Sequence, residues 1–164
     1  MMNLPQFEDL DLSPELLKAV EKKGYRRPTS IQQEAIPAIM EARDVLGSAP
    51  TGTGKTAAFL LPALQHLLDS PRRKPGPPRI LILTPTRELA IQVAEQAEEL
   101  AQFTHLAIAT ITGGVAYQNH GEVFNSNQDL VVATPGRLLQ YIKEENFDCR
   151  AVEMLIFDEA DRML

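Results

Sequence analysis

The sequence contains a single cysteine, Cys149, among its 164 residues. One thiol cannot build an internal disulfide framework or a cysteine-rich zinc module, so the sequence excludes both. Long apolar runs are also missing, because the longest, residues 57–64, is short and contains Pro62. The N-terminus has neither the basic nor the apolar region of a signal peptide. By elimination, we expect a reduced, cytoplasmic setting.

An excess of positive charge is absent as well. The formal net charge is −6, which argues against a protein that holds nucleic acid by bulk charge alone. Residues 1–87 carry twelve Lys and Arg against nine Asp and Glu, and residues 88–164 carry four against thirteen. A local basic run, Arg72–Lys74 with Arg79, lies in and beside the proline-rich stretch 71–78. We interpret this run as a solvated loop in preference to a nucleic-acid contact.

Short apolar, β-rich segments alternate along the chain with segments of helical period. Strands that are apolar almost throughout and are separated by helices are typical of a parallel sheet covered on both faces. The sequence therefore predicts an α/β fold with a doubly wound parallel sheet in one domain, long enough to bury a sizeable core. The expected strands are 45–48, 80–84, 106–111, 130–133 and 152–157, and the expected helices are 56–68, 87–102, 115–124 and 135–143.

Two further helices are expected ahead of the first strand. Ser13 and Pro14 are the residue types favoured at the N-cap and the first helical position, and Gly24 closes this helix. Ser30 begins the second helix, which Pro37 is expected to bend.

Residues 45–56 combine a strand, a glycine-rich loop and the start of a helix, which is the context of a phosphate-binding P-loop. Gly52 and Gly54 allow the backbone to turn so that consecutive N–H groups face phosphate oxygens. We expect Lys55 to reach the β- and γ-phosphates and Thr56 to place its hydroxyl on Mg²⁺. Ala49 departs from the general pattern, which has glycine there; the alternative is a strand-to-helix turn with an incidental lysine. The expected nucleotide contacts in this loop are Ala49, Thr51, Gly52, Thr53, Gly54, Lys55 and Thr56.

Acidic residues follow the last expected strand, at Asp158, Glu159 and Asp161. Ligands of open parallel sheets bind at the carboxyl ends of the strands. A P-loop enzyme needs one carboxylate there for Mg²⁺ and another to orient or deprotonate the attacking water. We assign Asp158 to the metal and Glu159 to the general base, and with Lys55 they make up the expected catalytic set. The alternative is a solvated acidic turn.

The P-loop and the Asp-Glu-Ala-Asp sequence at 158–161 together resemble the first RecA-like domain of DEAD-box ATP-dependent RNA helicases. The similarity extends from Phe7 to the last residue, and residues 24–32 resemble the Q motif of that family. Gln32 has the donor and the acceptor needed to pair with adenine, and Tyr25 offers a ring on which adenine can stack. Seen singly, Gln32 is typical of a surface glutamine on a helix, and Tyr25 is typical of a packing tyrosine. The resemblance adds Phe7, Arg27 and Pro28 as support for the adenine pocket.

Three segments resemble the RNA-contacting motifs of the family. Each follows an expected strand and precedes a helix, so N–H groups, hydroxyls and arginines are expected along one rim of the sheet. Such groups hold a sugar-phosphate backbone without reading bases. The alternative is that each segment is an ordinary strand-to-helix turn with capping residues. The expected RNA contacts are Pro85, Thr86, Arg87, Gly113, Gly114, Thr134, Pro135, Gly136 and Arg137.

The resemblance implies a RecA-like P-loop NTPase domain with three α/β/α layers. Residues 1–40 would hold the N-terminal helices and Q motif, and 41–164 the ATP-binding core, truncated after 158–161 and without the second RecA-like domain. The implied function is hydrolysis of ATP with Mg²⁺ coupled to local RNA duplex unwinding. Within the family, stretches 44–99 and 140–150 most resemble a bacterial helicase associated with assembly of the large ribosomal subunit. The partners implied are therefore ribosomal RNA and ribosome-assembly proteins.

A non-catalytic nucleotide- and RNA-binding module stays open as an alternative. Another class of P-loop enzyme, such as a DNA helicase or a kinase, is disfavoured by Gln32 together with residues 158–161. In the family a second domain supplies arginine fingers, so we expect the chain alone to bind nucleotide without efficient turnover. A central strand is also expected to be missing. We therefore interpret the chain as a piece of a longer protein that alone is marginal, oligomeric or closed by some other strand. The residues His66, His105, His120 and Cys149 share no metal-ligand spacing and are interpreted as structural or surface residues.

Overall fold

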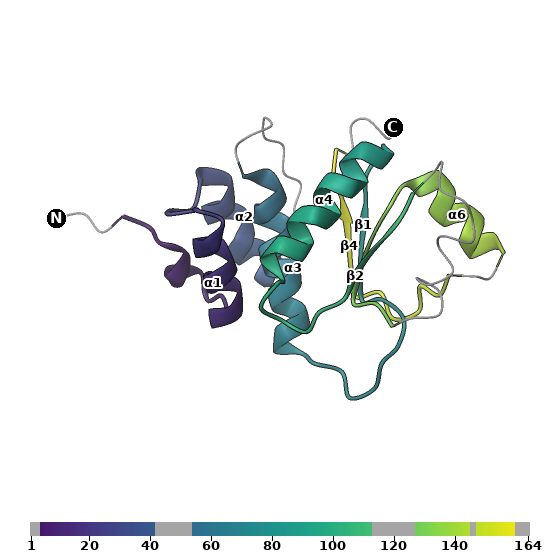
Figure 1. The fold of residues 1–164 in the computed structure, drawn as a ribbon, viewed down its shortest axis with the longest axis horizontal. Helices are drawn as coiled ribbons and strands as arrows, with labels where there is room; N and C mark the ends of the chain where they lie inside the picture. Colours follow the sequence, from purple (N-terminus) through teal and green to yellow (C-terminus); the bar gives the residue numbers. More distant parts are fainter. Residues whose placement is uncertain (1–3, 42–53, 113–126, 145–146, 160–164) are drawn as a thin grey trace. The chain divides into compact units, whose positions relative to one another are not determined.

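A computed structural model of the chain describes residues 4–41, 54–112, 127–144 and 147–159 (Figure 1). The contacts divide the chain into two compact units. The first contains residues 1–71 and 96–105, and the second contains residues 72–95 and 106–164. The expected strand at 45–48 and the expected helix at 115–124 lie outside the described residues.

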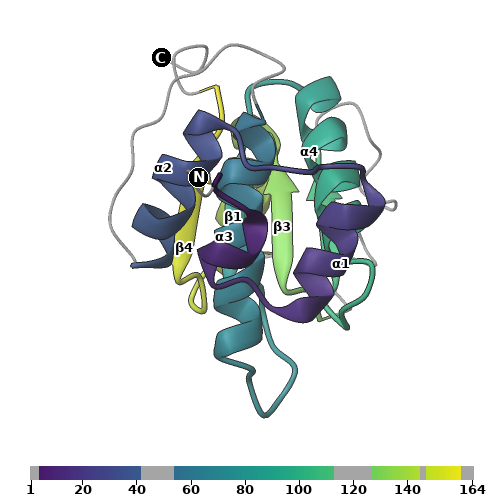
Figure 2. The ribbon, with the colours of Figure 1, turned by 90° about the vertical axis from the view of Figure 1, so that its left-hand side faces the viewer.

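The first unit is helical. It contains the 3₁₀ helix η1 (Phe7–Leu10) and the α-helices α1 (Pro14–Lys22), α2 (Ser30–Met40) and α3 (Lys55–Asp69). The end of α4 (Arg87–Leu100) also belongs to it. Helix α2 packs against α3 and contacts η1 (Figure 2). The core of this unit includes Phe7, Leu16, Val20, Ile36, Leu60, Leu61 and Leu64, all of them buried.

The two N-terminal helices confirm the sequence prediction, whereas η1 was not predicted. Ser13 is the N-cap residue of α1, and Gly24 follows its end with φ +81°. Helix α2 begins at Ser30 and contains Pro37. A buried glutamine, Gln65, ties the start of α1 to α3: its Oε1 accepts from the backbone N–H of Ser13 at 2.6 Å, and its Nε2 donates to Ser13 Oγ at 2.8 Å.

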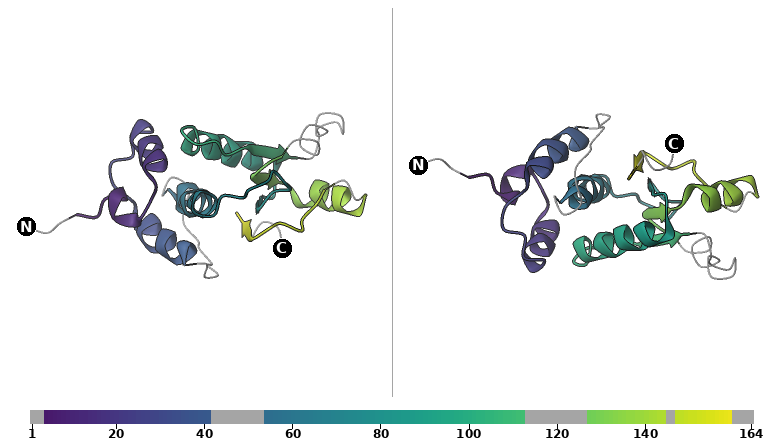
Figure 3. Two further views of the ribbon diagram at one scale, coloured as in Figure 1. Left: turned by 90° about the horizontal axis from the view of Figure 1, so that it is seen from below. Right: turned by 90° about the horizontal axis from the view of Figure 1, so that it is seen from above.

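The second unit is built on a four-stranded sheet. Its strands are β1 (Ile80–Leu83), β2 (Ile108–Ile111), β3 (Leu130–Ala133) and β4 (Met154–Phe157), in the spatial order β2-β3-β1-β4. Every pairing is parallel, so the predicted α/β fold is confirmed. The N-terminal part of α4 and helix α6 (Pro135–Lys143) lie on opposite faces of this sheet (Figures 1 and 3).

The sheet face beneath α6 forms a continuous apolar core. Leu81, Val131 and Ile111 lie on this face and pack with Leu138 and Tyr141 of α6. All four residues of β3 are buried, as are the first three of β1, which agrees with the near-continuous apolar sequence of these strands.

Strand β4 departs from the expectation of a sheet covered on both faces. Leu155 and Phe157 are 49% and 56% exposed. The register places Leu155 beside Leu81 and Phe157 beside Leu83, so both continue the face that α6 covers over the other strands. Because β4 is the last strand in the described order, it has one described neighbour, β1.

The basic run at 72–79 proves to be partly structural. Arg72 Nη2 donates to the carbonyl of Gln128 at 2.9 Å and to Asp129 Oδ1 at 3.3 Å, which fixes the loop to the amino end of β3. Arg79 is 7% exposed and forms an ion pair with Glu153, just before β4. The interpretation of the run as a solvated loop is therefore wrong for these two arginines. It holds for the rest of the run, Arg73 and Lys74, which are both exposed.

Within the described ranges, no helix combines the length and the hydropathy that crossing a membrane requires.

Candidate functional site

The end of the P-loop lies at the start of α3. Gly54 is the N-cap residue of this helix and has φ +80°, a left-handed conformation that glycine adopts without steric cost. Lys55 and Thr56 are the first two residues of α3 and are half-buried. N–H groups in a first helical turn have no intrahelical acceptor and carry partial positive charge, so this segment suits a phosphate. The other P-loop residues named above, Ala49, Thr51, Gly52 and Thr53, lie outside the described residues.

Gln32 joins the Q-motif segment to the P-loop. Its side chain is buried, and its Oε1 accepts a hydrogen bond from the backbone N–H of Thr29 at 2.9 Å. The Thr29 hydroxyl accepts in turn from the backbone N–H of Gln32, which completes a capping box at the start of α2. The Gln32 Nε2 donates to the carbonyl of Gly54 at 3.1 Å. The adenine contact of Gln32 stays a prediction, and its contact with Gly54 was not predicted.

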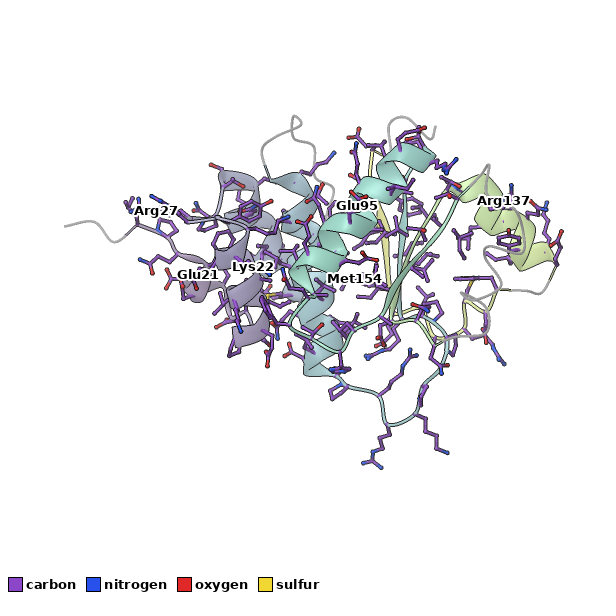
Figure 4. The ribbon with its side chains drawn as sticks, viewed as in Figure 1. Glu21, Lys22, Arg27, Glu95, Arg137 and Met154 are labelled. Carbon is purple, nitrogen blue, oxygen red and sulfur yellow. The ribbon has the colours of Figure 1, made fainter. Side chains whose placement is uncertain are left out.

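The other residues expected at the adenine pocket also lie in the first unit. Phe7 and Pro28 are buried, whereas Arg27, labelled in Figure 4, is exposed. Tyr25 is half-buried, and the Lys23 ammonium lies 5.5 Å from the centre of its ring. An ammonium at that distance is attracted by the ring face, so one contact of the Tyr25 ring is a cation–π interaction.

In the second unit, Asp158 and Glu159 directly follow β4, at the carboxyl end of the sheet as predicted. Asp158 is 5% exposed. Glu159 has φ +57°, a left-handed conformation that costs a non-glycine residue about 1–2 kcal/mol. Residues held in such conformations cluster at functional sites. The backbone conformation of Glu159 therefore independently favours a functional position.

Asp158 shares one rim of the sheet with Thr84 and Thr134. Each is the first residue after its strand, and each donates its backbone N–H to the last carbonyl of the neighbouring strand at 2.9–3.0 Å. The three residues therefore occupy equivalent positions at the carboxyl ends of the neighbouring strands β3, β1 and β4. The acidic segment and two of the expected RNA motifs are thus brought to the same edge.

The segment after β1 leads into α4. Thr86 caps this helix, because its hydroxyl accepts from the backbone N–H of Leu89 at 3.2 Å. Its carbonyl accepts from the Thr84 hydroxyl at 3.2 Å. Pro85 is half-buried, and Arg87, the first residue of α4, is exposed. The turn therefore has the capping chemistry of an ordinary strand-to-helix turn and also presents an exposed arginine.

The segment after β3 has a similar form. Thr134 is the N-cap residue of α6, Pro135 is its first residue, and Gly136 is exposed. The guanidinium of Arg137, labelled in Figure 4, lies 5.8 Å from the ring centre of the buried Tyr141. This contact joins two residues one helical turn apart on α6 and keeps the arginine near the rim of the sheet. The third expected RNA segment, Gly113–Gly114, lies outside the described residues.

Cys149 shows the features of a structural thiol, as interpreted from the sequence. It packs against the α6-side core, and burial followed by the negative charge of Asp148 raises its pKa. A raised pKa leaves little thiolate, the nucleophilic form. Hydrogen bonds from Arg150 lower the pKa of Asp148 to about 2. Among the residues that the structure describes, no group of three His, Cys, Asp or Glu is arranged to hold a metal ion.

Comparison with known proteins finds that residues 29–164 match the family of DEAD/DEAH box helicases. The ATP-dependent RNA helicase SrmB of Haemophilus influenzae is 90% identical over 163 residues, which are 99% of this chain and 37% of that protein. SrmB of Escherichia coli is 73% identical with the same coverage. The ATP-dependent RNA helicase RhlB of Klebsiella pneumoniae is 44% identical over 96% of this chain and 38% of that protein. The chain thus spans little more than a third of the length of these relatives.

Proposed function

The chain belongs to the DEAD/DEAH box helicase family. From that premise we propose that it is the part of an RNA helicase that binds ATP and one stretch of RNA. The whole protein would couple ATP hydrolysis to local separation of RNA strands. The observation that carries this proposal is the family match over residues 29–164, which includes Gln32, the P-loop and the Asp158–Asp161 segment. The relatives named above are ATP-dependent RNA helicases, which supports ATP and RNA as ligands.

Lys55 and the first-turn N–H groups of α3 would bind the phosphates of the nucleotide. The Thr56 hydroxyl and the Asp158 carboxylate are hard oxygen donors, which fit Mg²⁺. When bound, Mg²⁺ supplies neutralisation of the charge on the phosphates. Glu159 would accept a proton from the attacking water, and Gln32 with Tyr25 would select and stack the adenine.

The RNA would lie along the carboxyl rim of the sheet. Thr86, Arg87, Thr134 and Arg137 would bind the sugar-phosphate backbone, so recognition would be independent of base sequence. The matching positions of Asp158, Thr84 and Thr134 support this arrangement, because they align the acidic segment with two of the three expected RNA segments on neighbouring strands.

The cellular role rests on resemblance to the bacterial helicase associated with large-subunit assembly. We propose ribosomal RNA and ribosome-assembly proteins as partners and the cytoplasm as the location. We also propose that the 164 residues alone bind nucleotide and turn it over inefficiently, since the family takes its arginine fingers from a second RecA-like domain. An arginine finger accelerates phosphoryl transfer by about 10³–10⁵-fold.

Nucleotide binding and RNA-stimulated phosphate release by the chain test these proposals. Lys55→Ala should weaken ATP binding at least about tenfold, because it removes the charge that contacts the phosphates. Lys74→Ala, which removes an exposed loop lysine, is the matched control and should leave binding unchanged. Equal binding by the Lys55 variant would refute the P-loop assignment. Efficient RNA-stimulated hydrolysis by the chain, abolished by Lys55→Ala, would refute inefficient turnover. Absence of hydrolysis from a longer protein carrying both domains would favour the non-catalytic module.

A further inference from the structure

Two lysines of α1 are held against one aromatic ring. Lys18 and Lys22 are one helical turn apart, and their ammonium nitrogens lie 4.3 Å and 5.5 Å from the ring centre of Phe103. Lys22 Nζ also donates to Gln102 Oε1 at 2.8 Å. All of these residues belong to the first unit, and both lysines are exposed. We call Lys18, Lys22 and Phe103 the lysine platform.

Among the described residues, no carboxylate forms an ion pair with Lys18 or Lys22. The neighbouring Lys23 is different, because it forms an ion pair with Glu99. Helix α1 also carries Glu15 and Glu21, and neither forms an ion pair with Lys18 or Lys22 in the described part of the chain (Figure 4 labels Glu21 and Lys22).

Two like charges four residues apart on a helix repel each other, which destabilises the helix. The face of the Phe103 ring attracts both ammonium groups and offsets part of that repulsion. The lysine platform is therefore a pair of cations positioned before any anion arrives, in a chain whose formal net charge is −6. Positioned groups lose less conformational entropy on binding than free lysine side chains do.

We propose that the lysine platform binds phosphates of the RNA backbone, as a contact additional to the rim of the sheet; this rests on the proposed RNA-binding function. Each ammonium offers a compact charge and three donors without a fixed fork geometry, which suits the phosphates of a flexible single strand. Two ammonium groups already lie over the Phe103 ring, which favours contact with a phosphate over stacking of a base. RNA presents an anion at every nucleotide, whereas an acidic peptide needs a particular run of carboxylates.

Binding of a labelled single-stranded poly(U) RNA to the full chain, measured at KCl concentrations from about 50 to 200 mM, tests the proposal. The test variant is Lys18→Ala/Lys22→Ala. The matched control, Arg73→Ala/Lys74→Ala, removes the same charge from an exposed loop of the second unit. A third variant, Arg87→Ala/Arg137→Ala, weakens the rim on which the proposed function depends. Polyglutamate in place of RNA tests an acidic-peptide partner, and thermal unfolding verifies that each variant is folded.

The slope of log affinity against log salt should become shallower by about 1.4 in the platform variant, because each neutralised phosphate of a single strand contributes about 0.7. Over the fourfold salt range, the unmodified chain then loses about sevenfold more affinity than the variant. An unchanged slope, an equal change in the control, or a platform-dependent preference for polyglutamate would overturn the proposal. If only the rim variant leaves RNA binding intact, the proposed rim fails and the lysine platform stands. If only the platform variant leaves RNA binding intact, the lysine platform fails and the proposed rim stands.

Discussion

Replacing Gly54 by alanine probes the contact between the Q-motif segment and the P-loop. Gly54 has φ +80°, so any side chain there adopts a left-handed conformation. A Cβ atom would collide with Gln32 Nε2 and would lie 3.1 Å from Gln32 Cδ and 3.3 Å from Thr29 Oγ1. The buried Gln32 side chain must move, and its hydrogen bond to the Gly54 carbonyl is lost.

The cost has two parts with different origins. The left-handed backbone costs alanine about 1–2 kcal/mol. Losing the Gln32–Gly54 hydrogen bond and disturbing the cap at Thr29 each cost about 1 kcal/mol. We therefore expect Gly54→Ala to reduce the free energy of unfolding by about 3–4 kcal/mol.

Gly24→Ala is the matched control, because Gly24 has φ +81° and a Cβ atom there would meet nothing within 4 Å. Urea unfolding of both variants separates backbone strain from collision, and Gly54→Ala should cost about 2 kcal/mol more than the control. A Gln32→Ala/Gly54→Ala double variant should lose less than the two single variants added together, since the collision partner is gone. Equal costs at Gly54 and Gly24, together with additivity in the double variant, would refute the reasoning.

Three other changes have defined outcomes. Arg150→Ala should raise the pKa of Asp148 from about 2 towards its ordinary 3.8, measured by NMR titration of the carboxyl group. Because the folded-state pKa is lowered, the stabilisation from this pair is present above the unfolded pKa and is lost as the pH falls through the folded value. Gln65→Ala should cost about 2–3 kcal/mol in urea unfolding, since it leaves polar groups of Ser13 without their partners, and a cost below about 0.5 kcal/mol would contradict the bonding described. Leu60→Ala should cost about 2–5 kcal/mol by opening a cavity at a fully buried site, and a cost within about 0.5 kcal/mol of zero would contradict its burial.

The elements with strong local signals were predicted closely. The predicted bounds of β3 and α6 coincide with the observed ones, because Thr134 and Pro135 mark the boundary between them with an N-cap and a first-turn proline. Strand β2 begins two residues later than predicted, at Ile108. The preceding Ala107 instead donates its N–H to a side-chain oxygen of Asp129, a bond from a distant residue that composition alone does not reveal.

The site was predicted from motifs, and the features that the motifs did not predict are tertiary contacts. The resemblance to DEAD-box helicases is confirmed by the family match and by the identity to the SrmB relatives. The placement of Asp158 after a strand at the sheet edge is confirmed as well. The bond from Gln32 to Gly54 was missed because it joins residues 22 positions apart. The tertiary contacts of Arg72 and Arg79 were missed because a run of charges does not show which members find partners across the fold. The chemical roles assigned to the site residues stay predictions.

The central position of β1 has a consequence for insertions and deletions. Its four residues pair with β3 on one side and β4 on the other, and the residue after it hydrogen-bonds to the end of β3. Removing one residue from β1 would slip its register and turn Leu81 and Leu83 to the opposite face. The same slip would misalign Thr84 with Thr134 and Asp158 at once. A length change in β1 would therefore displace the acidic segment after β4 and the turns after β1 and β3 relative to one another in a single step.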